Sequence, residues 1–133
     1  MNAQARPMDG KVVVVTGAGN GIGQAIALLL AGQGASVVVN DLGASGSGEG
    51  RDAGPAQKVV DEIAAAGGVA VANTDSVATP EGANAIVQTA ITRFGRIDGV
   101  VNNAGILRDR IFHKMNREEW QAVIDVHLNG SYY

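Results

Sequence analysis

A run of β-branched residues from Lys11 to Val15 leads directly into a turn that contains four glycines. The run, KVVVV, has the composition of a parallel strand that is buried on both faces. A stretch rich in Ala, Leu and Ile follows from Gln24 to Gln33 and predicts a helix. A strand, a glycine turn and a helix in this order place a helix N-terminus at the end of a strand. The free backbone N–H groups there can bind a phosphate.

The spacing of these glycines defines the turn more closely. It is not the GxGxxG fingerprint, because the sixth position counted from Gly17 is Ile22; the pattern is TGxxxGxG over residues 16–23. The glycines still allow a tight turn, access of a pyrophosphate to the backbone, and packing of the helix on the strand. An ordinary glycine turn is the alternative. The turn residues that we predict to bind a nucleotide are Gly17, Asn20, Gly21, Ile22 and Gly23.

Asp41 follows a second apolar run, Ser36 to Asn40, and lies 24 residues after Gly17. An acidic residue about 20 residues past the first glycine is placed to accept hydrogen bonds from the ribose hydroxyls of adenosine. The 2′-phosphate of NADP would meet like charge there, and no Lys or Arg lies between Lys11 and Arg51. We therefore predict NAD as the cofactor. The alternative role for Asp41 is to cap the turn that follows it.

The rest of the chain continues the alternation of strands and helices. The expected elements are a glycine-rich loop at 43–54, helices from Pro55 to Ala66 and from Thr79 or Pro80 to a stop at Gly95, strands at 69–72 and 99–101, and a last helix capped by Asn116 with Glu119. Each of the three helices has an expected buried side. For the helix from Pro55 it is Ala56, Val59, Val60, Ile63 and Ala64, and for the helix that ends at Gly95 it is Ala83, Ile86, Val87, Ala90, Ile91 and Phe94. For the last helix it is Trp120, Val123 and Ile124. This order predicts an α/β fold, a parallel sheet with helices on both faces and strand order 3-2-1-4.

Composition excludes several classes of function. The chain is 46% hydrophobic and 17% charged, which suits one folded domain. Its net charge of −3 argues against nucleic acid as a partner, and the absence of cysteine excludes disulfides and thiolate metal sites. We expect no metal. The longest apolar stretch, Ala25 to Ala31, is too short to span a membrane, and the N-terminus does not resemble a signal peptide, so we expect a cytoplasmic protein without a membrane partner.

Three motifs in register resemble the short-chain dehydrogenase/reductase family. They are TGxxxGxG at 16–23, Asp-Ser-Val at 75–77, and Asn-Asn-Ala-Gly at 102–105 after the fourth strand. The resemblance begins at about residue 10 and continues to the end of the chain. It implies a Rossmann-type, doubly wound three-layer fold and hydride transfer between a secondary alcohol or ketone and NAD. By this resemblance Asp75 and Ser76 border the adenine, and Asn102, Ala104 and Gly105 line the cofactor. The alternatives are a turn residue at 75 and asparagines that tie backbones together.

Four stretches, at 38–43, 72–77, 105–110 and 126–130, are similar to a narrower group. This is the (3R)-hydroxyacyl-CoA dehydrogenase domain of peroxisomal multifunctional enzymes type 2, with its bacterial single-domain relatives. The similarity implies a 3-hydroxyacyl-CoA or hydroxysteroid substrate and a homo-oligomer. His127 stands where most of the family has a catalytic Asn, so it is a candidate catalytic residue, although a core role is the alternative. Arg108 and Arg110 are candidates for contact with an acyl-CoA, or belong to a solvated loop.

The family's proton-transfer residues, a Ser and a Tyr-x-x-x-Lys motif, are not found in the 133 residues, whose only tyrosines are Tyr132 and Tyr133. We therefore expect residues 1–133 to be the NAD-binding front half of a longer product that carries the catalytic residues. The alternative is a noncatalytic NAD-binding module that a partner chain completes.

Overall fold

The computed structural model describes residues 6–44, 48–50 and 52–133. Four parallel strands form its sheet: β1 (Val12–Val15), β2 (Ser36–Asn40), β3 (Val69–Asn73) and β4 (Gly99–Val101). Their order across the sheet is β3-β2-β1-β4. The α/β class and the strand order 3-2-1-4 predicted from the sequence are confirmed.

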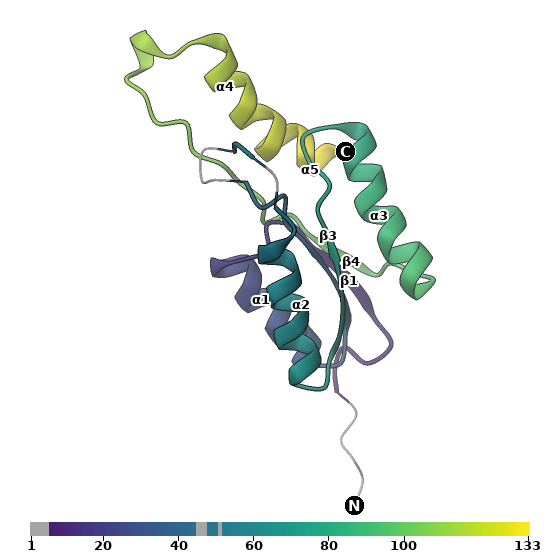
Figure 1. Ribbon diagram of the computed structural model, residues 1–133. Coiled ribbons are helices and arrows are strands. Elements are labelled where there is room, and N and C mark those ends of the chain that lie inside the picture. Colours follow the sequence, from purple (N-terminus) through teal and green to yellow (C-terminus); the bar gives the residue numbers. More distant parts are fainter. Residues whose placement is uncertain (1–5, 45–47, 51) are drawn as a thin grey trace, which may run out of the picture.

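Helices lie on both faces of this sheet (Figure 1). Those described are α1 (Gly21–Gly32), α2 (Gly54–Ala65), α3 (Pro80–Phe94), α4 (Arg117–Ile124) and α5 (Gly130–Tyr132), with a 3-10 turn η1 (Phe112–Lys114) and a π-helical turn η2 (Asp125–Asn129). Helices α1 and α2 cover one face and α3 covers the other, which gives the three expected layers. None of these helices has the length and hydropathy needed to cross a membrane.

The two cores follow from the alternation of side chains along β1. Val13 and Val15 pack with α1 and α2, whereas Val12 and Val14 pack with α3, and all four are nearly inaccessible to solvent. Full burial of each such side chain contributes on the order of 1.5–3 kcal/mol. A continuous run of valines is therefore what a strand between two helical layers requires.

The helix ends use the capping residues that the sequence indicated. The Thr79 side chain accepts a hydrogen bond from the Gly82 backbone N–H, and Gly95 closes α3 with a left-handed φ of 76°. Asn116 and Glu119 form a reciprocal capping box at the start of α4, at 2.8 and 3.0 Å. Each of these predictions is confirmed.

Some predicted boundaries differ from the structure. Helix α1 begins at Gly21 rather than Gln24, because the positive φ of Gly21 (54°) lets the chain enter the helix from within the glycine turn. Strand β1 begins at Val12 rather than Lys11, and β3 extends to Asn73. Residues 45–47 of the predicted glycine-rich loop and Arg51 lie outside the described residues.

Three residues expected on buried faces are exposed, namely Ala64, Ile91 and Trp120. Ala64 and Ile91 lie at the margin of the apolar stripe of α2 and α3, beyond the width that the sheet covers. Trp120 is 55% exposed, because α4 extends away from the sheet (Figure 1) and has no buried residue in the part of the chain that the structure describes. The helical spacing therefore identified the helices correctly but overstated how far their apolar faces are covered.

Candidate nucleotide site

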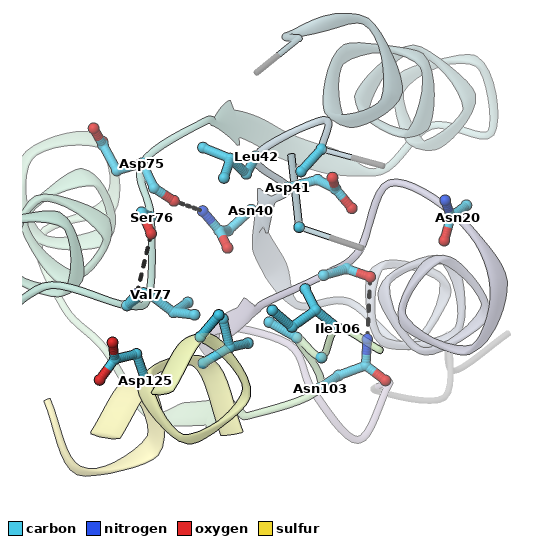
Figure 2. Close-up of a pocket in the computed structure, with 18 of the residues that line it drawn as sticks. Asn20, Asn40, Asp41, Leu42, Asp75, Ser76, Val77, Asn103, Ile106 and Asp125 are labelled. Atoms are coloured by element: carbon cyan, nitrogen blue, oxygen red, sulfur yellow. Dashed lines mark hydrogen bonds between the residues drawn. The ribbon is translucent and has the colours of Figure 1, made fainter. Parts of the chain in front are cut away.

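The carboxyl ends of all four strands open onto one cavity of about 590 Å³ (Figure 2). A volume of this order is typical of small-molecule sites, and this edge of a doubly wound sheet is where such sites form. The predicted site residues that line the cavity are Gly17, Asn20, Ile22, Asp41, Asp75, Ser76, Ala104 and Gly105. The structure thus brings together residues that are up to 88 positions apart in the sequence.

The glycine turn leaves backbone open to this cavity. Gly17 has a φ of 63°, and a Cβ added to it would lie 2.8 Å from Ala104 Cα, so no side chain fits. Gly21 has a φ of 54°, and no atom lies within 4 Å of where its Cβ would be. The side chain of Asn20 makes no capping hydrogen bond at the start of α1. The first N–H groups of this helix are therefore not capped by Asn20, as a site for phosphate requires.

Gly23 has a different function from Gly21. A Cβ there would collide with the Gly17 carbonyl oxygen and lie 2.5 Å from Asn103 Nδ2, so glycine allows α1 to pack on the turn. Neither Gly21 nor Gly23 is among the residues that line the cavity, although both shape the turn beside it.

Asp41 has the turn-capping role that the sequence left as its alternative, and it also borders the cavity. It lines the cavity, and its carboxylate also accepts hydrogen bonds from the backbone N–H groups of Gly19 and Gly43, each at 2.8 Å. Sequence reasoning missed Gly19: a Cβ there would lie 2.7 Å from Asp41 Oδ2. The available signal was the additional glycine inside the TGxxxGxG pattern.

The segment after β4 is tied to the glycine turn by Thr16 and Asn103. The Thr16 hydroxyl accepts hydrogen bonds from the backbone N–H groups of Asn103 (3.1 Å) and Ala104 (3.0 Å). Asn103 Nδ2 donates to the carbonyl oxygens of Thr16 and Gly17, at 3.1 Å each. Asn103 therefore ties backbones together, which was one of the two alternatives for the asparagine pair.

Asn102 points elsewhere. It lines a second cavity of about 90 Å³ that is walled by Val14 of β1 and Ile86 of α3, on the face of the sheet that α3 covers. The structure thus separates Asn102 from the predicted cofactor-lining residues and places Asn103 with them.

His127 lies in η2 and contacts the segment after β4 without lining the large cavity. Its Nε2 atom is 3.1 Å from the Ile106 backbone nitrogen and 3.0 Å from the Ile106 carbonyl oxygen. The ring also lies against Gly105, where a Cβ would be 2.7 Å from His127 Cε1. This geometry gives His127 a role in holding the chain at 105–106.

A buried polar network that the sequence did not indicate lies at the ends of β2 and β3. Asn40 and Asn73 are paired in register, and Asn40 Nδ2 donates to Asn73 Oδ1 and to the Asp75 carbonyl oxygen, each at 2.9 Å. Asn73 Nδ2 in turn donates to Asp75 Oδ2 at 2.8 Å. The available signal was an asparagine at the end of each of two neighbouring apolar strands.

The charged groups of the cavity wall are mostly acidic. Asp41, Asp75 and Asp125 line it, and Arg108 is the one basic side chain among the described lining residues. Arg108 Nη1 is 4.0 Å from Glu49 Oε1. Arg108 lies after β4, outside the stretch between Lys11 and Arg51 in which the sequence has no Lys or Arg, and it still reaches this wall.

Arg110 does not line the cavity; its Nε is 2.7 Å from Glu119 Oε1. The pKa of Glu119 is held below its usual value, first by the Asn116 N–H and then by Arg110. No group of three or more potential metal ligands occurs among the described residues.

These features fit a dinucleotide. The glycine turn offers backbone N–H groups for a pyrophosphate, Asp41 offers a carboxylate for ribose hydroxyls, and Asp75 borders the other end of the cavity (Figure 2).

Comparison with known proteins agrees with this geometry. A family model described as short chain dehydrogenase matches residues 11–133. A protein of Mycobacterium tuberculosis named as a short-chain type dehydrogenase/reductase is 58% identical over 92% of this chain, which spans 43% of that protein. The peroxisomal multifunctional enzyme type 2 of Mus musculus is 55% identical over 93% of this chain and 16% of its own length.

A solved structure of a metagenomic short-chain oxidoreductase in complex with NADP superimposes with a TM-score of 0.82 at 36% identity, covering 94% of this chain and 53% of that one. The chain spans less than half the length of the M. tuberculosis relative. The family model covers nearly the whole chain, and the motifs, fold and relatives agree with it. The chain belongs to the short chain dehydrogenase family.

Proposed function

We propose that this chain binds NAD(H) in the cavity at the carboxyl ends of its strands and serves a hydride transfer between a secondary alcohol or ketone and the nicotinamide ring. The observation that carries the proposal is the convergence of the glycine turn and Asp41 on one cavity wall. When bound, the cofactor supplies the hydride acceptor or donor. What the chain supplies is binding and orientation.

The residues named from the sequence would divide this task. The turn at 17–23 would bind the pyrophosphate at the N-terminus of α1. Asp41 would accept hydrogen bonds from the adenosine ribose, while Asp75 and Ser76 would border the adenine. Ala104 and Gly105, which line the cavity beside the turn, would form the wall along the cofactor.

The preference for NAD over NADP rests on Asp41. A 2′-phosphate beside this carboxylate would be repelled, and Asp41 is fixed in place by two backbone N–H groups. Two observations favour NADP instead. Arg108 also lines the cavity, and the metagenomic relative was solved with NADP. The fixed carboxylate is the stronger argument, because it lies beside the turn that would hold the pyrophosphate.

The substrate proposal is a 3-hydroxyacyl-CoA or a hydroxysteroid, which would place the protein in lipid metabolism. Its support is the similarity to the multifunctional enzymes. The Ser and the Tyr-x-x-x-Lys that transfer the proton would be supplied by residues other than 1–133. A cytoplasmic location and a homo-oligomeric state also remain proposals, and relatives include a peroxisomal enzyme.

Titration with NADH and NADPH tests the cofactor proposal, with the quenching or enhancement of nicotinamide fluorescence as the readout. We expect saturable binding with NADH the tighter ligand. No saturable binding of either nucleotide would refute the proposal. The complete gene product should then form NADH from NAD⁺ and a (3R)-hydroxyacyl-CoA or a hydroxysteroid. Binding without turnover of either class would leave the cofactor proposal standing and remove the substrate proposal.

A further inference from the structure

The carboxylate of Asp75 is held by an amide whose hydrogen-bonding groups all have partners. Asn73 Nδ2 donates to Asp75 Oδ2 at 2.8 Å and to Thr89 Oγ1 at 2.9 Å. Asn73 Oδ1 accepts from Asn40 Nδ2 and from the Asp75 backbone N–H, both at 2.9 Å. These four hydrogen bonds use both donors and both lone pairs of the amide.

This amide has one stable orientation. A flip would place Asn73 Nδ2 against two other donors, Asn40 Nδ2 and the Asp75 N–H, and would turn its oxygen toward the Asp75 carboxylate. Asn40 is 2% exposed and Asn73 8% exposed, so water cannot easily replace the lost partners. The Thr89 hydroxyl donates to the Ala85 carbonyl oxygen at 2.9 Å, which leaves its lone pairs to accept from Asn73.

We propose that Asn73, held by Asn40 and Thr89, is a positioning residue that gives the nucleotide site its base specificity, by fixing the Asp75 carboxylate for the 6-amino group of adenine. The proposal rests on the proposed function, because the nucleotide must bind with its base beside Asp75. A carboxylate only accepts hydrogen bonds. Adenine presents an amino donor at position 6, and hypoxanthine presents a carbonyl oxygen there, so a fixed carboxylate favours adenine.

Neither Asn73 nor Thr89 is among the residues that line the cavity. An effect of Thr89 on the choice of base would therefore have to pass through the amide of Asn73 to Asp75. Thr89 lies on α3, and its hydroxyl is two hydrogen bonds away from the Asp75 carboxylate, through Asn73 Nδ2. A substitution at Thr89 therefore tests the proposal more directly than one at Asn73, because it leaves the side chains of the cavity wall in place.

The test compares the dissociation constants of NAD⁺ and nicotinamide hypoxanthine dinucleotide for the full chain, with nicotinamide mononucleotide as a probe that has no base. Wild type should bind the adenine dinucleotide about tenfold more tightly than the hypoxanthine one. Asn73→Ala should remove most of this preference and Thr89→Val part of it. Thr89→Ser, which keeps the hydroxyl, should retain it. Thermal unfolding reports whether each variant is folded.

The preference for adenine, rather than affinity itself, decides the proposal. A lower preference in Thr89→Val that Thr89→Ser restores, with unchanged binding of the mononucleotide, would support it. If Thr89→Val bound both dinucleotides equally more weakly, the role of Thr89 would be merely structural and the proposal would be overturned. A wild type that binds NAD⁺ without preferring adenine would overturn it too. If Asn73→Ala does not fold, the two Thr89 variants decide. Failure of wild type to bind either dinucleotide would overturn the proposed function, and this inference with it.

Discussion

The carboxylate of Asp41 accepts a hydrogen bond from the backbone N–H of Gly19, at 2.8 Å, and a second one from the N–H of Gly43. The acid that we expect to select NAD is therefore also a support of the glycine turn. Hydrogen bonds to a charged acceptor are stronger than those between neutral groups. A substitution at Asp41 should alter both the cofactor preference and the order of the turn, so the two effects have to be measured separately.

The double variant Asp41→Ala with Leu42→Arg should weaken NADH binding and permit NADPH binding. It removes a ribose acceptor and adds a cation for the 2′-phosphate at a residue that also lines the cavity. The loss of a hydrogen bond to a charged group, about 1.5–3 kcal/mol, corresponds to roughly ten- to hundredfold in affinity for NADH. Titration of both nucleotides measures it. Leu42→Arg alone keeps the support of the turn and serves as the control. Tighter binding of NADPH than of NADH by wild type would contradict the prediction.

Gly21→Val should abolish nucleotide binding. The substitution places a branched side chain at a φ of 54°, in the open space beside the first turn of α1. Gly32→Val is the matched control, since Gly32 lies at the other end of the same helix, has no positive φ, and has no atom within 4 Å of its Cβ position. NADH titration and circular dichroism of both variants give the comparison. A folded Gly21→Val protein with normal affinity would mean that the turn is only structural.

The elements and the general place of the site could be predicted from local pattern alone. The valine runs, the glycine turn and the Asn116 cap each determine structure within a few residues. Asp41 could be placed at the site by its spacing from Gly17, whereas Asp75 was placed there by the resemblance to the family, and both line the cavity.

The other contacts of the site depend on the register between strands and on the direction in which each side chain points. Asn102 and Asn103 are adjacent, and side chains alternate along extended backbone, so Asn103 contacts the glycine turn whereas Asn102 lines the second cavity. The pairing of Asn40 with Asn73 requires the register of β2 on β3, which strand propensities do not determine. Arg108 reaches the cavity through an irregular segment, for which no periodicity exists to guide a prediction.

Asp98 joins the beginning of β1 to the beginning of β4, and its loss should destabilise the fold. Its Oδ2 accepts from the Val12 N–H at 2.8 Å, and its Oδ1 lies 2.6 Å from Arg96 Nη2. The hydrogen bond from Arg96, and then that from Val12, hold the pKa of Asp98 below its ordinary value. Asp98→Asn should therefore lower Tm by a few °C at neutral pH.

The pH dependence of this difference has a defined sign. Because the pKa of Asp98 is lower in the folded chain, the stabilisation is complete above the carboxyl pKa of the unfolded chain, about 4, and is lost as the pH falls through the lowered value. Thermal unfolding of wild type and Asp98→Asn from pH 7 down to about pH 3 should converge at the acid end. Asp61→Asn, at an exposed carboxylate that accepts from the neutral Gln57 side chain, is the control. A difference between wild type and Asp98→Asn that is independent of pH would contradict this account.

His127→Asn should preserve the order of the segment after β4, whereas His127→Ala should reduce it. In the folded chain the same His127 Nε2 atom lies near both the N–H and the carbonyl oxygen of Ile106. One nitrogen can satisfy only one of the two groups at a time, since it accepts in one tautomer and donates in the other. An asparagine amide has a separate acceptor and donor and can satisfy both, while alanine satisfies neither.

Loss of one such bond, about 0.5–1.5 kcal/mol, should speed exchange of the Ile106 amide by up to roughly tenfold. Hydrogen exchange at that amide is the measurement, and NADH formation by the complete gene product is the second readout. Full protection of Ile106 in His127→Asn together with loss of turnover would contradict the positioning role and point to His127 as the proton carrier.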